Sequence, residues 1–203
     1  MLDAIRRFAD RLAETPTTFH WLRKLPEANY RETKRRIAAI RDELGHPRVL
    51  DLGCGTAEYA ELFDPTRYLG VDIHPGYVAY AQRRMPAHRF VVADVRSWAG
   101  EPDRFDLVMI NGVLHHLDDA SVQEFLRTAK RLIAPGGTLL VIEDVDLADP
   151  PLGTRLVHLL DHGDHIRDAA RWQALVSAVS PIARSETYTS GICPYHLMVC
   201  PQP

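Results

Sequence analysis

The spacing of hydrophobic residues along the chain changes near residue 48. Before that point, apolar residues recur at the three- and four-residue intervals typical of helices, and Pro16, Pro26 and Pro47 interrupt the pattern. We therefore expect helices over residues 1–45, with the third running from about 27 to 44. A basic run on that third helix is interspersed with acids, which favours a solvated face over a binding patch.

After residue 48, short apolar runs of β type alternate with helical stretches. This alternation predicts right-handed crossovers and a parallel sheet covered by helices on both faces. Two late β-type runs are separated by too few residues for a crossover helix, so we expect them to pair as an antiparallel edge hairpin. The predicted strands are 48–52, 68–71, 89–92, 105–110, 138–142, 182–188 and 196–199; the predicted helices are 58–63, 75–85, 120–133, 152–160 and 167–179.

Composition narrows the class of protein without identifying it. The chain has 203 residues, 46% of them hydrophobic and 25% charged, which fits one globular domain. A net charge of -3 gives no basic field for nucleic acid. Three cysteines suit a reducing cytoplasm, and no apolar run approaches the roughly 20 residues of a membrane span. We therefore expect a cytoplasmic protein with no nucleic-acid partner and no membrane span.

Acids and glycines gather where the predicted parallel strands end. Open α/β sheets bind ligands at the carboxyl ends of their strands. Gly53 and Gly55 would let a ligand approach the backbone, and Asp72 lies 19 positions beyond Gly53. That spacing is close to the roughly 20 residues expected for an acid that binds ribose hydroxyls. Asp94 could accept a hydrogen bond from an adenine amino group, while Val95 offers its backbone N–H.

Two ligands favour such a glycine turn: a dinucleotide and S-adenosylmethionine (SAM). The dinucleotide fingerprint G-x-G-x-x-G requires a third glycine at position 58, where this chain has Glu58. A glutamate there would oppose the charge of a pyrophosphate. SAM carries a cationic sulfonium and no phosphate, so acidic surroundings suit it. The residues favour SAM, and a dinucleotide oxidoreductase stays as an alternative.

Four stretches in this order give a more specific resemblance: VLDLGCGTA, LGVDIHP, FDLVMINGVLHHLDD and RLIAPGGTLLVIED. The chain resembles a class I SAM-dependent methyltransferase over roughly residues 48–144. It is especially similar to the small-molecule group that includes the ubiquinone/menaquinone-biosynthesis methyltransferases. One departure is Ala57, where the family often has a third glycine, and we expect only a slight reshaping of the turn.

The resemblance implies an α/β fold, a Rossmann-like doubly wound sheet that is mostly parallel with an antiparallel C-terminal edge hairpin, plus N-terminal helices. It divides one domain, 1–203, into a helical lid (1–45), a cofactor-binding core (46–149) and acceptor-side helices with the hairpin (150–203). As a lid, the N-terminal helices would turn Tyr30 or Trp21 toward the ligand; as plain packing, they would only cover the sheet. The cofactor-binding residues are then Asp51, Gly53, Gly55, Asp72, Ile73, Asp94, Val95, Asn111 and Tyr30.

The residues after Asn111 bear on the methyl acceptor. Enzymes that methylate exocyclic base nitrogens commonly carry an Asn/Asp-Pro-Pro-aromatic run at this strand end, to hold a flipped base. This chain has Gly112-Val113-Leu114 instead, which argues against DNA and RNA. His115 and His116 follow, and either could act as a general base. The competing interpretation is that they fix the loop or cap the next helix.

A second histidine cluster follows the fifth predicted strand, where the family builds its acceptor pocket. Our hypothesis is that Asp161, His162, His165 and Arg167 line that pocket. His158 and His162 have the four-residue spacing of helical metal ligands. Gly163 makes a continuous helix doubtful, and we assign no metal.

The sequence thus predicts a SAM-dependent transfer of a methyl group to the oxygen, nitrogen or carbon of a small molecule. One rival is a non-catalytic SAM-fold subunit that partners an active enzyme. Another is a SAM enzyme that performs chemistry other than methylation. The acceptor, the atom methylated and the formation of a homodimer stay open.

Overall fold

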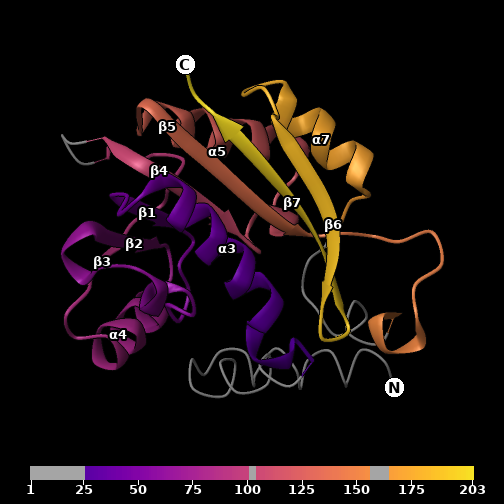
Figure 1. The fold of residues 1–203 in the computed structure, drawn as a ribbon, viewed down its shortest axis with the longest axis horizontal. Helices are drawn as coiled ribbons and strands as arrows, with labels where there is room; N and C mark the ends of the chain where they lie inside the picture. Colours follow the sequence, from indigo (N-terminus) through magenta and orange to yellow (C-terminus); the bar gives the residue numbers. More distant parts are fainter. Residues whose placement is uncertain (1–25, 101–103, 156–164) are drawn as a thin grey trace.

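A computed structural model describes residues 26–100, 104–155 and 165–203 (Figure 1). Within these ranges a seven-stranded sheet has the order β3-β2-β1-β4-β5-β7-β6. Strands β1 to β5 pair in parallel, and β7 runs antiparallel to both β5 and β6. This confirms the doubly wound sheet with an antiparallel edge hairpin. The strands are β1 (Val49–Leu52), β2 (Tyr68–Asp72), β3 (Arg89–Val92), β4 (Phe105–Asn111), β5 (Ile133–Asp144), β6 (Arg184–Ser190) and β7 (Cys193–Pro201).

Helices lie on both faces of the sheet, α3 and α4 on one and α5 and α7 on the other (Figure 1). No helix in the described ranges is long and apolar enough to cross a bilayer. The helix expected over 152–160 is described only as far as residue 155, and it is helical there. The α-helices are α3 (Arg31–Leu44), α4 (Pro75–Arg84), α5 (Asp119–Arg131) and α7 (Ala169–Ser177); single 3₁₀ turns cover Ala28–Tyr30, Ala60–Leu62, Pro65–Arg67 and Leu114–His116.

The helix predicted over 58–63 is wrong: only the 3₁₀ turn Ala60–Leu62 forms there. Ala57 has a left-handed backbone (φ 61°) directly before this segment, and Asp64-Pro65 begins another turn directly after it. Pro65 cannot donate a backbone hydrogen bond to a continuing helix. The glycine turn is therefore followed by a short irregular connection rather than by the N-terminus of a regular helix.

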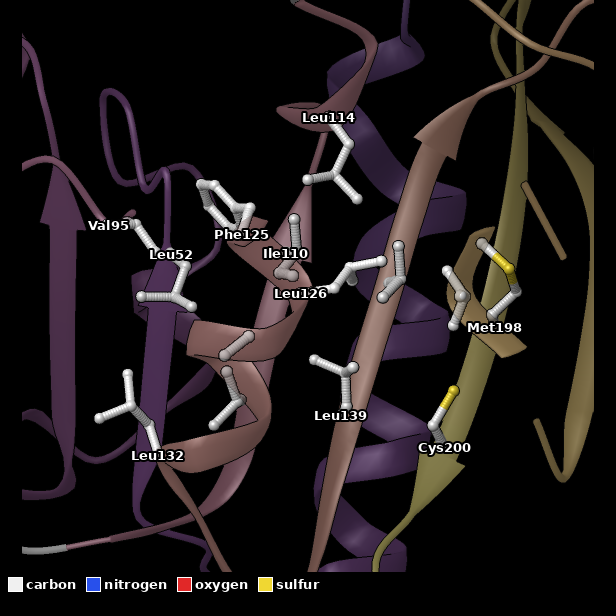
Figure 2. Close-up of a cluster of buried hydrophobic side chains, with 14 of the residues drawn as sticks. Leu52, Val95, Ile110, Leu114, Phe125, Leu126, Leu132, Leu139, Met198 and Cys200 are labelled. Carbon is white, nitrogen blue, oxygen red and sulfur yellow. The ribbon is translucent and has the colours of Figure 1, made fainter. Parts of the chain in front are cut away.

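Alternate residues of the central strands feed two hydrophobic cores. Val108 and Ile110 of β4 pack with α5 and α7, while Leu107 and Met109 pack with α3 and α4. Figure 2 shows the first of these cores, in which Ile110 lies near Leu126 of α5. Each such side chain contributes about 1.5–3 kcal/mol when fully buried. Burial on both faces explains why these strands read as continuous apolar runs.

A buried glutamate holds the loop that follows β4. The carboxylate of Glu143, near the end of β5, accepts hydrogen bonds from the backbone N–H groups of Val113 (3.0 Å), Leu114 (2.8 Å) and His115 (3.3 Å). The same carboxylate lies 2.9 Å from Nδ1 of His115. One side chain thus satisfies three consecutive backbone donors, so the path of this loop is set by β5.

The chain before α3 is held by the turn between β6 and β7. The N–H of Ile192 donates to the Pro26 carbonyl (2.8 Å), and the hydroxyl of Ser190 donates to the Glu27 carbonyl (2.9 Å). A Cβ on Gly191, whose φ is 61°, would lie only 2.0 Å from the Pro26 carbonyl oxygen. Ala28–Tyr30 then follows a left-handed path, with φ of 48°, 59° and 57°. Position 191 therefore controls where Glu27 and Tyr30 lie.

Replacing Gly191 tests this attachment. We expect Gly191→Ala to lower the free energy of unfolding by about 3 kcal/mol, because it combines a left-handed alanine with a backbone clash. The control is Gly136→Ala, at a φ of 75° with no atom within 4 Å of the added Cβ, which carries the positive-φ penalty without a clash, about 1 kcal/mol. Urea unfolding gives both values, and faster amide exchange at Ile192 should accompany the first variant. Equal costs for the two variants would contradict the proposed contact.

Candidate active site

A cavity of about 430 Å³ opens at the carboxyl ends of the central strands. It lies where a doubly wound sheet binds its ligands. The structure brings together in its lining all nine residues predicted to bind the cofactor, although their roles remain predictions. These residues are Tyr30, Asp51, Gly53, Gly55, Asp72, Ile73, Asp94, Val95 and Asn111.

The glycine turn forms the centre of the cavity, and its two glycines serve different purposes. Both have positive φ, 79° at Gly53 and 51° at Gly55. A Cβ on Gly53 would lie 2.3 Å from Cγ2 of Val113, so Val113 excludes a side chain there. A Cβ on Gly55 would meet no atom within 4 Å. Gly55 is thus the position where backbone is left open for a ligand.

Asp72 connects the glycine turn to the end of β2. One carboxylate oxygen accepts the N–H of Gly55 and the other accepts the N–H of His74, both at 2.8 Å. Burial raises the pKa of this carboxyl, and the two hydrogen bonds lower it. The neighbouring Ile73 is an exposed apolar side chain (62%) at the rim of the cavity. Asp72 therefore shapes the turn as well as facing the cavity.

Asp51 is a buried acid inside an apolar strand. The hydroxyl of Tyr68 donates to its carboxylate at 2.6 Å. Burial raises the pKa of Asp51 to about 7; the Tyr68 hydrogen bond lowers it, and the nearby charge of Asp72 raises it. Asp51 therefore titrates near neutral pH, and a cationic ligand would favour its ionised form.

Asp94 lies beyond β3 and is ion-paired with Arg96. The guanidinium donates from Nη2 (2.7 Å) and from Nε (3.1 Å) to the two carboxylate oxygens. These hydrogen bonds hold the pKa of Asp94 below its ordinary value. Because Arg96 also lines the cavity, this edge presents a paired charge rather than a single one.

The structure changes the argument that Glu58 makes against a dinucleotide. The Glu58 carboxylate is buried and ion-paired with Lys34 and with Arg84, each at 3.1 Å. Its charge is therefore balanced by two cations. The site offers a pyrophosphate no helix N-terminus, because only the 3₁₀ turn Ala60–Leu62 follows the glycine turn.

The two candidate histidines have different environments. His115 is fully buried, holds Glu143 through Nδ1, and is not part of the cavity lining. His116 is exposed and lines the cavity, with its ring centroid 4.1 Å from that of His115. Of the two, only His116 is placed to touch a ligand in this cavity. Glu143, which positions His115, was not predicted, although its signal is an acid at the end of an apolar strand.

Of the residues predicted to line the acceptor pocket, Asp161 and His162 lie outside the described residues, as do His158 and Trp21. His165 and Arg167 are described, and neither lines the cavity. Arg167 instead donates to the Leu117 carbonyl (2.7 Å) and to Asp119 (2.8 Å) and lies over the Trp172 ring. It holds the loop after β4 from outside. The described part of the chain contains no group of three or more side chains suited to a metal.

The cavity also has lining residues that sequence reasoning did not find. Glu27, Tyr59 and Tyr195 contribute to it from the segment before α3, from the turn after β1 and from β7. None of them lies at the end of a parallel strand, so the strand-end rule could not identify them. They reach the cavity through tertiary packing of the hairpin and the N-terminal segment.

Comparison with known proteins agrees with this geometry. Residues 49–137 match the family described as "Methyltransferase domain". A trans-aconitate 2-methyltransferase of Methylobacterium nodulans is 39% identical over 107 residues, covering 51% of this chain and 40% of that protein. Nodulation protein S of Rhizobium tropici is 34% identical over 97 residues, covering 45% and 40%. The chain therefore spans less than half the length of these relatives.

Solved structures share the fold over most of the chain. The N-methyltransferase NodS of Bradyrhizobium japonicum, in complex with S-adenosylhomocysteine, gives a TM-score of 0.75 at 17% identity and covers 96% of this chain and 97% of its own. A magnesium protoporphyrin IX methyltransferase of Synechocystis gives 0.69 at 16% identity, covering 90% and 87%. The family match over residues 49–137 thus shows a likeness to methyltransferase domains, and the solved structures, each under 25% identical, show that the chain has their fold.

Proposed function

We propose that this protein transfers a methyl group from SAM to a small-molecule acceptor. The observation that carries the proposal is the acidic cavity at the strand ends, centred on a glycine turn that no regular helix follows. A ligand with a cationic sulfonium and no phosphate suits both properties. A dinucleotide suits neither, because its pyrophosphate would meet acids without a helix N-terminus.

The described residues fit SAM group by group. The Asp72 carboxylate can accept hydrogen bonds from a ribose diol, and the exposed side chain of Ile73 offers an apolar surface to adenine. The side chain of Asn111 lines the cavity and hydrogen-bonds to Tyr59; its amide has two N–H donors, so one can donate to the methionine carboxylate. Asp51, with its raised pKa, is suited to the methionine ammonium.

When bound, SAM supplies a methyl group on a positively charged sulfur that is open to in-line attack. The contribution of this chain is alignment and exclusion of water. Tyr30 and Tyr59 line the cavity with their rings in edge contact, at a centroid distance of 5.9 Å. The imidazole of His116, which lines the same cavity, is the group proposed to remove a proton from the acceptor.

We extend the proposal to a cytoplasmic location. All three cysteines, Cys54, Cys193 and Cys200, are buried and none forms a disulfide, which suits a reducing compartment. The partner we infer is a small molecule rather than nucleic acid, in accord with the net charge of -3. Self-association as a homodimer is a further hypothesis, which sedimentation of the pure protein would test.

Incubation of the protein with SAM and a metabolite extract tests the proposed reaction. We expect S-adenosylhomocysteine to accumulate, together with a product heavier by the roughly 14 mass units of an added methylene, as a methyl replaces a proton. Binding of SAM without any such product would favour the rival that uses SAM for other chemistry. Absence of SAM binding would contradict both methyl transfer and other SAM chemistry, and it would overturn the proposal.

The pH dependence of binding tests the part assigned to Asp51. Because its pKa is raised to about 7, the carboxyl is largely protonated below that pH and must ionise to attract the ligand ammonium. The Kd for S-adenosylhomocysteine should therefore fall as pH rises from 6 to 7, by up to about tenfold per unit, and level off near pH 8. Calorimetry on Asp51→Asn should show weaker binding without this slope.

Protein stability provides a second readout for Asp51. Between pH 4 and pH 7 the folded state keeps a proton on Asp51 that the unfolded state releases, so this group makes the fold less stable as pH rises. Asp51→Asn, which can still accept the Tyr68 hydroxyl, should be the more stable protein at pH 8 and differ little at pH 4. Wild-type binding that does not change between pH 6 and 8 would contradict the assignment.

A further inference from the structure

Tyr68 begins β2, is only 3% exposed and does not line the cavity. In the parallel register of β1 and β2, Tyr68 lies opposite Val49, and Gly70 lies opposite Asp51. The hydroxyl of Tyr68 nevertheless spans this offset of two residues and donates to Oδ2 of Asp51 at 2.6 Å. A residue outside the cavity thus contacts an acid in its wall.

Three rings hold the side chain of Tyr68 in place. The ring of Phe63 is stacked on it at a centroid distance of 5.9 Å, and the rings of His88 (5.4 Å) and Phe90 (5.9 Å) meet it at steep angles of 84° and 67°. A ring packed in this way keeps one rotamer, because the surrounding interior is close-packed. The hydroxyl is therefore held at Asp51 before any ligand arrives.

The proton of this hydrogen bond belongs to Tyr68. Burial raises the pKa of Tyr68 well above its ordinary value, the charge of Asp51 raises it further, and the charge of Arg84 has a smaller, opposite effect. The phenol therefore keeps its proton near neutral pH and acts as a donor. A hydrogen bond to an ionised acceptor is about twice as strong as one between neutral groups. The hydroxyl thus stabilises the ionised form of Asp51 more than the protonated form.

The other groups beside Asp51 do not favour its charge. Burial raises the pKa of the Cys54 thiol, in the glycine turn, well above its ordinary value, so this thiol stays neutral. The negative charge of Asp72, at the end of β2, raises the pKa of Asp51. From the other neighbouring strand, β4, the apolar Met109 lies opposite Asp51. Of these groups, the Tyr68 hydroxyl alone favours the charged carboxylate.

We propose that Tyr68 is a positioning residue for the methyl donor: its hydroxyl holds one oxygen of Asp51 and keeps this acid ionised near neutral pH, ready for the ammonium of the methionine part. The inference rests on the proposed function, since it takes SAM as the ligand. Tyr68 acts through Asp51 rather than by touching the donor. Without the hydroxyl, Asp51 would ionise only at higher pH, and the donor would bind weakly until that proton was lost.

Tyr68→Phe tests this with two ligands, because phenylalanine keeps the ring and removes only the hydroxyl. Methylthioadenosine shares the adenosine and the sulfur of S-adenosylhomocysteine but has a methyl group where the latter has its amino-acid chain. Calorimetry between pH 6 and 9 should show the pH midpoint of S-adenosylhomocysteine binding raised by about one unit or more in the variant. At pH 7 its affinity should fall about tenfold, and the loss should shrink toward pH 9. Methylthioadenosine, which has no ammonium, should bind both proteins within about twofold at every pH.

Two further variants separate action through Asp51 from a general loss of packing. Tyr188→Phe removes another buried hydroxyl, which donates to Thr33 at 2.9 Å, and it should leave the binding of both ligands unchanged. In the Asp51→Asn background, Tyr68→Phe should have no further effect on S-adenosylhomocysteine binding. Such non-additivity is expected where one residue acts only through the other.

The outcomes also separate this inference from the proposed function. An unchanged pH midpoint in Tyr68→Phe, or a loss of S-adenosylhomocysteine affinity that is the same at every pH, would overturn the inference. An equal loss for methylthioadenosine would overturn it too, because Tyr68 would then shape the cavity instead of acting through Asp51. Wild-type binding of S-adenosylhomocysteine without pH dependence would overturn it and leave the proposed function in place. Failure of the wild-type protein to bind S-adenosylhomocysteine would overturn the proposed methyl transfer itself.

Discussion

The hydrogen bonds that Asp72 accepts from Gly55 and His74 are the constraint on which the cavity depends. They attach the glycine turn after β1 to the end of β2, and this attachment keeps the backbone at Gly55 open to a ligand. Glu143 does the same for the loop after β4 by accepting three consecutive N–H groups. In both cases a buried carboxylate replaces the water that these donors would otherwise require.

The acids of the cavity thus fall into two kinds. Glu58 and Asp94 are balanced by cations of this chain, and they shape the walls. Asp51 is a buried acid that faces the cavity and accepts the hydroxyl of Tyr68. A buried carboxylate raises the free energy of the folded state unless a positive charge approaches it. This cost is the physical reason to infer a positively charged donor beside Asp51.

Much of the fold could be predicted from local patterns. Apolar runs with short connections indicated the parallel strands, and acids at strand ends indicated Asp72 and Asp94. The rest depends on long-range packing. Glu27 lines the cavity from a segment that is hydrogen-bonded to the hairpin turn at Gly191, and Tyr195 lines it from β7; no local pattern records either placement. The sequence position of Arg167 suggested that it lines the acceptor pocket, whereas its side chain donates a hydrogen bond to the Leu117 carbonyl in the loop after β4.

The central claim is that this cavity binds an adenosyl sulfur compound rather than a dinucleotide. Calorimetric titration of the protein with S-adenosylhomocysteine, and separately with NAD⁺, tests it directly. The residues at the strand ends predict binding of S-adenosylhomocysteine at one site per chain. Because no helix N-terminus follows the glycine turn to receive a pyrophosphate, NAD⁺ should give no heat of binding. Binding of NAD⁺ with comparable affinity, or no binding of S-adenosylhomocysteine, would contradict the claim.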